Sequence, residues 1–429
     1  MNGVVLRSSA VNSPRTIQAE DRDAPRPIYC VWEITLRCDQ ACEHCGSRAG
    51  PVREDELSTA ELFEVADALV RLGTREVTLI GGEAYLRGDV YQLIEHIAKQ
   101  GPRVTMQTGG RGLTADRAKK LRAAGLAAIG VSIDGMEGTH DTLRASTGSH
   151  ASALRAVHNG RAAGLLVSSN SQINRLNMHE LRDIAAELEA AGVSVWRAQL
   201  TAAMGRAGDH PDWILQPYMV LEVIDTLAQI QNESFARARA KGIPEARAFH
   251  VALGNNLGYF GPHERLLRTR PGKEDRYFTG CQAGQYVMGI ESDGTVKGCP
   301  SLPTAPYTGG NVRTMTLEDI WRNGEAMKFT RDRTIEELWG FCRSCYYADI
   351  CRGGCSFTTH SALGRRGNNP FCYYRASELR KRGIREELIH AKKPPGDPYD
   401  FGRFELQEAP WSDAPPPEQP KRSLAIVSG

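Results

Sequence analysis

Six short apolar segments alternate with helical patterns in the first half of the chain, and this alternation constrains the fold more than any other feature. The segments cover residues 28–34, 76–80, 103–108, 126–133, 165–173 and 193–200. Each is short and apolar, as expected of strands that are buried on both faces. The helical patterns between them begin at Ser58 and then cover residues 89–100, 114–124, 151–163 and 177–191. One strand and one helix about every 30 residues predict a parallel sheet with right-handed crossovers.

The number of these units limits the kind of barrel that they can form. A closed barrel of eight units typically takes about 250 residues, and its active site lies where the carboxyl ends of the strands meet. Six units that end near residue 200 therefore predict an α/β fold with an open, partial (β/α)6 TIM-like barrel. We expect functional residues in the loops that follow the strands.

Three cysteines directly follow the first predicted strand in a C-x3-C-x2-C pattern, at Cys38, Cys42 and Cys45. A 4Fe–4S cluster normally has four cysteine ligands, so three would leave one iron open to a non-protein ligand. A zinc site is the alternative, but zinc ligands usually come as close pairs with a second pair nearby. The next cysteine after this triplet is Cys281. The spacing therefore favours an iron–sulfur cluster.

The triplet resembles the cluster loop of the radical S-adenosylmethionine (SAM) superfamily. Thr35-Leu36-Arg37 leads into it, and His44 stands at the aromatic position before the third cysteine. The resemblance implies that the amino and carboxylate groups of SAM chelate the open iron. It also implies that an electron from this catalytic cluster splits SAM into methionine and a 5′-deoxyadenosyl radical, which takes a hydrogen atom from a substrate.

Further segments resemble the SAM-contacting motifs of this superfamily. Gly81-Gly82-Glu83-Ala84 follows the second predicted strand and resembles Gly-Gly-Glu-Pro, with Ala84 in place of the proline. The resemblance implies that this segment binds the amino group of SAM. Two glycines let the backbone approach a ligand closely, and a carboxylate can accept hydrogen bonds from an ammonium group.

The later strand ends supply weaker candidates for SAM binding. Thr108-Gly109-Gly110 stands where the superfamily usually has Thr-Asn-Gly, so a side-chain contact at Gly109 is lost. By resemblance, Ser132 and Arg144 contact the carboxylate or ribose of SAM. The alternative for Arg144 is a surface ion pair with Asp141, three residues earlier.

The fifth and sixth strands each offer two candidates for the ribose and adenine of SAM. Ser169 or Asn170 lies on the fifth strand, and Gln199 or Leu200 lies on the sixth. We take Ser169 and Gln199 as the predicted contacts.

Seven cysteines form a second array in the last third of the chain: Cys281, Cys299, Cys342, Cys345, Cys351, Cys355 and Cys372. Their spacings resemble the SPASM domain, named for subtilosin, pyrroloquinoline quinone, anaerobic sulfatase and mycofactocin maturation enzymes. The resemblance implies two auxiliary 4Fe–4S clusters, and thus three clusters in all. It assigns Cys281, Cys299 and Cys355 to auxiliary cluster I. It assigns Cys342, Cys345, Cys351 and Cys372 to auxiliary cluster II.

Composition and punctuation predict the remaining organisation. The 429 residues include 53 Lys and Arg against 51 Asp and Glu, which gives no case for a nucleic-acid or membrane-surface partner. No apolar run is long enough for a spanning helix, and Met1 to Ser13 lack the core of a signal peptide, so we expect a cytoplasmic protein. We expect a flexible extension over 1–27, the barrel over 28–205 and a helical bridge over 206–275. The SPASM domain follows over 276–390, and 391–429 is expected to form a disordered tail.

Eleven cysteines in such a compartment are better explained by clusters than by disulfides. Only Cys30 lies outside the ligand patterns, and we expect it to be a small buried apolar residue.

The resemblance implies oxidative modification of a ribosomally made peptide, such as cross-linking. The partners would be the precursor peptide and a flavodoxin or ferredoxin reductant. Leader recognition would fall to a discrete partner protein or to the enzyme's own surface. Sulfatase-maturing relatives have an Asp after the second auxiliary-cluster cysteine, where this chain has Pro300, so we disfavour that activity.

Three alternatives stay open at this point. The substrate could be a small molecule that is oxidised or epimerised, such as a sugar or a tetrapyrrole side chain. The reaction could be peptide epimerisation. An iron–sulfur electron carrier is disfavoured because it needs neither the Gly-Gly-Glu segment nor a three-cysteine site.

Overall fold

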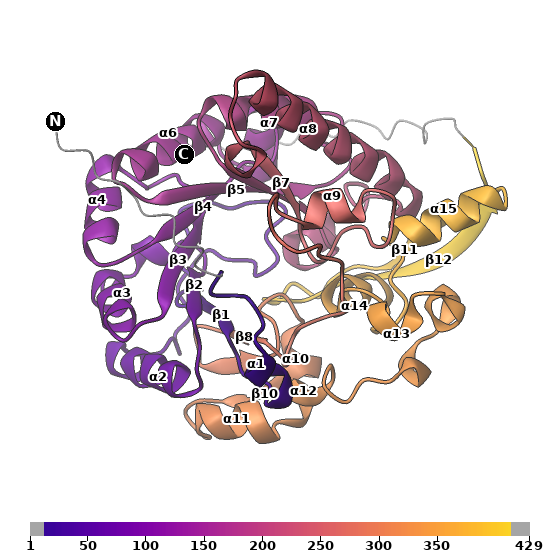
Figure 1. The fold of residues 1–429 in the computed structure, drawn as a ribbon. Coiled ribbons are helices and arrows are strands. Elements are labelled where there is room, and N and C mark those ends of the chain that lie inside the picture. The colour runs from indigo at the N-terminus through magenta and orange to yellow at the C-terminus, as the bar shows by residue number, and fades with distance from the viewer. Residues whose placement is uncertain (1–12, 413–429) are drawn as a thin grey trace.

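A single large sheet organises the computed structural model, which describes residues 13–412 (Figure 1). Its strand order is β10-β9-β8-β1-β2-β3-β4-β5-β6-β7. The strands are β1 (Tyr29–Glu33), β2 (Glu76–Ile80), β3 (Arg103–Thr108), β4 (Ala128–Ser132), β5 (Leu166–Ile173), β6 (Val195–Leu200), β7 (His250–Leu253), β8 (Val287–Ile290), β9 (Thr295–Lys297) and β10 (Thr308–Asn311). Strands β8 and β1 to β7 pair in parallel, and β9 and β10 are antiparallel additions. The first six strands fall within the six predicted segments, which confirms the predicted α/β fold.

Helices cover the outer face of this curved sheet, as Figure 1 shows. They are α2 (Thr59–Arg71), α3 (Val90–Lys99), α4 (Ala115–Ala123), α5 (Glu137–Arg144), α6 (Ser149–Ala162), α7 (Leu181–Ala190) and α8 (Val220–Ala240). The start of α2 illustrates why these residues form helices. The Ser58 hydroxyl accepts a hydrogen bond from the Glu61 backbone, and the Glu61 carboxylate accepts one from the Ser58 backbone, which completes a capping box.

The two faces of the strands differ in chemistry, because successive side chains alternate between them. On β6, the side chains of Trp196, Ala198 and Leu200 are buried in the apolar core under the helices. Arg197 and Gln199 therefore lie on the opposite face. We call this concave, polar side of the sheet the inner face.

The sheet extends across the predicted domain boundaries. Strand β7 lies within residues 206–275, which were predicted to form only a helical bridge, and β8 and β9 come from the cysteine-rich region. The remaining helices of that region are short: α9 (Glu264–Arg268), α10 (Thr304–Tyr307), α11 (Leu317–Asn323), α12 (Glu325–Lys328), α13 (Ala348–Cys351), α14 (Ser356–Leu363) and α15 (Tyr373–Lys381). Because β8 pairs with β1, the cysteine-rich region is built onto the edge of the barrel.

The chain is ordered at both ends of the described range, where flexible segments were expected. Helix α1 (Ala19–Asp23) is held by an ion pair between buried Asp21 and Arg75. At the other end, β11 (Ile384–Lys392) and β12 (Arg403–Pro410) form an antiparallel hairpin. The prediction of disorder from residue 391 is therefore wrong up to residue 412, because β12 buries Phe404 in the core despite its polar composition. Residues 1–12 and 413–429 lie outside the described range.

A buried polar network fixes the segment between β11 and β12 to the barrel. The Tyr399 hydroxyl donates a hydrogen bond to the carboxylate of Glu33, at the end of β1. Glu33 also accepts bonds from the backbone and hydroxyl of Ser292, after β8. The ammonium of Lys297 lies 3.9 Å from the centre of the Tyr399 ring and 2.7 Å from Glu291. One network thus joins the C-terminal segment, the barrel and the cysteine-rich region.

We predict that Tyr399→Phe lowers the free energy of unfolding by about 1–3 kcal/mol, because it removes a donor from a buried carboxylate. The measurement is anaerobic chemical unfolding of the cluster-loaded protein. Tyr346→Phe is the matched control, since Tyr346 is 83% exposed. Equal unfolding midpoints for the two variants would contradict a stabilising role for this network.

Candidate active site and cluster sites

The three-cysteine loop lies at the carboxyl end of β1, where the barrel rule places an active site. Its two ends are joined by hydrogen bonds from Cys38 N to Gly50 O and from Gly50 N to Leu36 O. Arg206 donates to the carbonyl oxygens of Cys42 and Ala49, at 2.6 and 3.0 Å. The backbone of the loop is therefore fixed by the protein, independently of any ligand that the sulfur atoms bind.

The Gly81-Gly82 pair lies against this loop at a distance that only glycine permits. A Cβ atom on Gly81 would lie 2.1 Å from the Thr35 carbonyl oxygen, and one on Gly82 would lie 2.6 Å from Cβ of Cys38. The close approach lets Gly82 N and Glu83 N donate to the carbonyl oxygens of Thr35 and Arg37. The two glycines thus bring Glu83 beside the cysteine loop.

Glu83 is buried and held in one orientation. Its two oxygen atoms accept hydrogen bonds from the Thr108 hydroxyl and from Gly109 N, both at 2.6 Å. Burial raises the pKa of this carboxyl to about 8, against the lowering effect of these two donors. A cationic ligand group, such as an ammonium, would stabilise the ionised form and lower this pKa again.

Gly109 replaces the usual Asn because another amide occupies that space. A Cβ atom there would lie 2.4 Å from Oε1 of Gln40. The amide nitrogen of Gln40 donates to Ser149 at 2.8 Å. The sequence analysis did not identify Gln40, although its position within the cysteine loop could have drawn attention to it.

Arg144 faces the cysteine loop and does not pair with Asp141. Its guanidinium forms a buried ion pair with Asp134 and lies 3.6 Å from Sγ of Cys42. Asp134 also lies 3.2 Å from Nε2 of His44. Among the two alternatives, the structure therefore favours a role for Arg144 in the site over a surface ion pair.

The other predicted SAM contacts divide between the two faces of the sheet. Ser132 and Gln199 lie on the inner face, because their strand neighbours belong to the outer core. Ser169 is fully buried on the outer side and donates to Val131 O. This corrects the choice of Ser169: its neighbour Asn170 lies on the inner face, where it bonds to Gln107.

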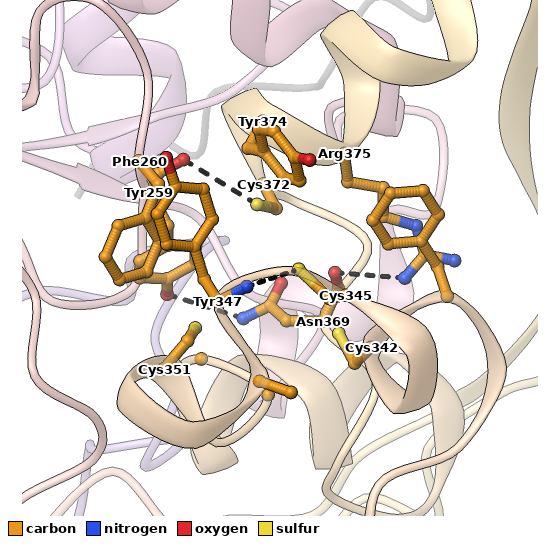
Figure 2. A pocket seen from close by; sticks show the side chains of 14 residues that line it. Tyr259, Phe260, Cys342, Cys345, Tyr347, Cys351, Asn369, Cys372, Tyr374 and Arg375 are labelled. Carbon is orange, nitrogen blue, oxygen red and sulfur yellow. Dashed lines mark hydrogen bonds between the residues drawn. The ribbon is translucent and has the colours of Figure 1, made fainter.

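Four cysteines of the second array surround one pocket, with an empty volume of about 360 Å³. They are Cys342, Cys345, Cys351 and Cys372, the set assigned to auxiliary cluster II (Figure 2). Tyr259, Tyr347 and Arg375 are among the other residues that line it, and Tyr347 N donates toward Sγ of Cys345 at 3.4 Å. Within residues 13–412, no three Cys, His, Asp or Glu side chains converge as they would on a single metal ion.

The other three cysteines form a separate group. Cys281 and Cys299 both pack against the small apolar cluster of Ala283, Leu302, Tyr307 and Phe329. Burial, together with the nearness of Cys281 and Cys299, raises the pKa of Cys355 to about 12. Gly353 and Gly354 adopt positive φ angles of 77° and 73° between Cys351 and Cys355. This turn sends two cysteines that are four residues apart to different groups.

A buried arginine near both groups of cysteines indicates whether negatively charged clusters would fit at these sites. Arg333 is 3% exposed, and its Nε and Nη2 atoms have no hydrogen-bond partner within the described range. Burial lowers its pKa, and the charges of Cys281, Glu337 and Cys351 act in the opposite direction, so one cysteine of each group lies near it. A buried guanidinium without a partner is costly. Negatively charged iron–sulfur clusters held by these cysteines would supply the missing partners, so the residues fit the groups.

Comparisons with known proteins agree with this geometry. Residues 32–188 match the model of the radical SAM superfamily, and residues 281–346 match the SPASM iron–sulfur cluster-binding domain. An AdoMet-dependent heme synthase of Methanosarcina barkeri is 30% identical over 370 residues, which are 82% of this chain and 97% of the relative. The chain belongs to the radical SAM superfamily and carries a SPASM domain.

A further relative and a solved structure of similar fold extend the comparison. The mycofactocin maturase MftC of Mycobacterium ulcerans is 28% identical over 84% of this chain and 91% of its own. The solved structure of native anSMEcpe with bound AdoMet and the Kp18Cys peptide matches with a TM-score of 0.63 at 14% identity. The match covers 82% of this chain and 94% of the chain in that structure, and it shows a similarity of fold alone.

The family assignment makes this chain a SAM-dependent enzyme with iron–sulfur cluster sites. None of the helices in residues 13–412 is both long and apolar enough to cross a membrane. Cys30 is fully buried in the outer core, as expected of a residue without a ligand role.

We predict that Cys351→Ala and Cys355→Ala disrupt different clusters, although the residues are four positions apart. In a Cys38/Cys42/Cys45→Ala background, iron content should fall from about twelve to about eight atoms, because one cluster of four is lost. In that background, the spectrum of reduced Cys355→Ala by electron paramagnetic resonance (EPR) should match that of Cys281→Ala. The spectrum of Cys351→Ala should match that of Cys342→Ala. A Cys355→Ala spectrum that instead matched that of Cys342→Ala would contradict the assignment of Cys351 and Cys355 to different clusters.

Proposed function

We propose that this enzyme takes a hydrogen atom from a ribosomally made peptide and completes a two-electron oxidation that forms a cross-link. One observation carries the proposal. The three-cysteine loop follows β1, the neighbouring strand β8 leads through β9 to Cys299, and all three strands belong to one sheet. When bound, the clusters would supply the electron that cleaves SAM and would accept the electron that hydrogen abstraction leaves on the substrate.

In this proposal the chain's own residues fix the reacting groups. Cys38, Cys42 and Cys45 hold the SAM-cleaving cluster. Glu83, with its oxygen atoms fixed by Thr108 and Gly109, receives the SAM ammonium. The remaining contacts come from the inner face, where Ser132, Asn170 and Gln199 lie, and from Arg144. The seven later cysteines hold two auxiliary clusters, one in each of the two groups described above.

The maturase relative supports the peptide as the substrate class. The partners would be a precursor peptide, a discrete leader-recognition protein and a flavodoxin or ferredoxin that reduces the first cluster. Pro300 follows Cys299, so the carboxylate that sulfatase-maturing enzymes have at this position is absent. A cross-linking oxidation therefore fits better than formylglycine formation.

The second candidate is oxidation of a tetrapyrrole side chain. The relative at 30% identity is named an AdoMet-dependent heme synthase, and this observation favours the second candidate. Both candidates use the same cluster sites and the same two-electron balance: one hydrogen atom passes to the 5′-deoxyadenosyl radical, and one electron and one proton leave afterwards.

We predict that a precursor peptide encoded beside the gene loses two hydrogen atoms when it is co-expressed with the enzyme. High-resolution mass spectrometry measures the loss, and the same experiment in deuterated water detects a mass-neutral epimerisation. Cys345→Ala is the informative control, because it should retain SAM cleavage at the first site and yield no product.

Two outcomes would contradict the peptide proposal. One is an unchanged peptide without deuterium while a tetrapyrrole is turned over, which would establish the second candidate. The other is unchanged peptide oxidation by the Cys42→Ala variant, which should form no 5′-deoxyadenosine.

A further inference from the structure

The inner face of the sheet carries a group of arginines that the proposed chemistry does not use. Arg103 begins β3, and Arg197 lies in the middle of β6. Arg15 precedes α1, and Arg270 follows α9. Arg103 and Arg197 face inward, because the residues next to them on their strands belong to the outer core. The four positive charges thus approach one region of the inner face from different parts of the chain.

One carboxylate is present in this region, and two of the arginines already use it. Glu76 accepts a hydrogen bond from Nε of Arg15 at 2.9 Å through one oxygen atom. It accepts another from Nη1 of Arg103 at 3.1 Å through the other. The Arg15 guanidinium also lies 3.6 Å from the centre of the Tyr29 ring. Both oxygen atoms of Glu76 are therefore engaged by Arg15 and Arg103.

Arg197 and Arg270 have no such partner. Neither guanidinium group forms a hydrogen bond or an ion pair with any residue from 13 to 412, whereas those of most arginines in this range do. Burial lowers the pKa of both groups, and the charges of Arg15 and Arg270 lower that of Arg197 further. The charges of Arg276, Arg103 and Arg15 likewise lower the pKa of Arg270. Positive charges therefore outnumber the carboxylate of Glu76 in this region.

The surroundings of Arg197 indicate a concave, water-accessible space. Arg197 is exposed to solvent although β6 is an interior strand between β5 and β7. Burial by the surrounding protein nevertheless lowers its pKa. Leu166, on the inner side at the start of β5, is 65% exposed. A side chain that is both surrounded by protein and reached by water lies in a hollow that a ligand can enter.

Neighbouring groups do not remove the excess charge. His250, at the start of β7, has a buried Nδ1 atom with no partner in the described part of the chain. Burial, and the charge of Arg270, lower its pKa to about 4, so it is neutral near pH 7. The uncompensated charge belongs to the arginines alone.

We propose that Arg197 and Arg270 bind a carboxylate of the substrate on the inner face. Guanidinium groups bind carboxylates with paired, charge-assisted hydrogen bonds. Arg197 lies two residues before Gln199 on the same face, a rise of about 7 Å along the strand. A substrate anchored there would extend toward the proposed SAM site. The inference rests on the proposed function, in that the ligand is the substrate of the radical reaction.

The carboxylate can belong to either of two kinds of substrate. A peptide offers carboxylates from Asp, from Glu and from its C-terminus, and a tetrapyrrole offers them from its propionate side chains. The proposed site would bind the carboxylate that both kinds of substrate carry, and two pairs of probes distinguish between them. One pair is a fluorescein-labelled tetra-glutamate peptide and its tetra-glutamine counterpart. The other pair is coproporphyrin III and its neutral tetramethyl ester.

The test is anaerobic fluorescence binding to the full, cluster-loaded chain with SAM present. The acidic member of one pair should bind at least about tenfold more tightly than its neutral counterpart, because charge-assisted bonds form in a sheltered site. Added salt should reduce the difference. Arg197→Gln and Arg270→Gln should each lose most of the preference, and Arg197→Lys should retain part of it. Arg155→Gln, on the exposed side of α6, is the control and should keep it.

Equal binding of acidic and neutral probes by the wild-type chain would overturn the proposal, and so would equal losses in the Arg155 and Arg197 variants. The assay requires no turnover, so it separates the two claims. Carboxylate binding that depends on Arg197, without any peptide modification, would contradict only the peptide proposal. Peptide modification with binding that is insensitive to both arginines would contradict only the carboxylate site.

Discussion

Parallel pairing of β8 with β1 is the contact on which the rest of the structure depends. β1 delivers the three-cysteine loop, and β8 begins the segment that leads to Cys299. Backbone hydrogen bonds between them fix the cysteine-rich region to the barrel edge, and Met288, Ile290 and Trp321 of that region belong to the same apolar core as the barrel. The Glu33–Tyr399 bond and the Ser292 contacts then close the carboxyl ends of the same two strands. The separation of the cluster sites is therefore set by sheet geometry.

Buried charge is concentrated where the clusters and SAM are proposed to bind. Arg144 lies beside Cys42, Arg375 lines the pocket of the four-cysteine group, and Arg333 lies between the two groups. Arg144 and Arg375 are paired with Asp134 and Glu386, whereas two nitrogen atoms of Arg333 have no partner among residues 13–412. Each guanidinium can offset the negative charge of a thiolate-ligated cluster and so influence its reduction potential.

The sequence predicted the features that depend on local pattern and spacing. All six strands were found, because short apolar segments alternate regularly with helical patterns along the chain. The division of the seven later cysteines between two clusters stays a prediction from the family resemblance. Features that depend on long-range pairing were missed. Ser169 was preferred over Asn170 because the sequence of this strand does not reveal which of two successive side chains faces the inner side of the sheet. Strand β12 was missed because its alternating charged residues resemble a solvated tail, and Gln40 could not be placed beside Gly109 without the fold.

The central claim is that the three-cysteine site leaves one iron open and that SAM binds to it. It is tested most directly by electron–nuclear double resonance on the reduced protein with SAM labelled with ¹⁵N at its amino group. Only the first cluster should be retained for this purpose, by replacing the seven later cysteines with alanine. The account predicts a ¹⁵N hyperfine coupling that disappears in the additional Cys42→Ala variant. A reduced cluster signal that shows no ¹⁵N coupling in the presence of saturating SAM would contradict it.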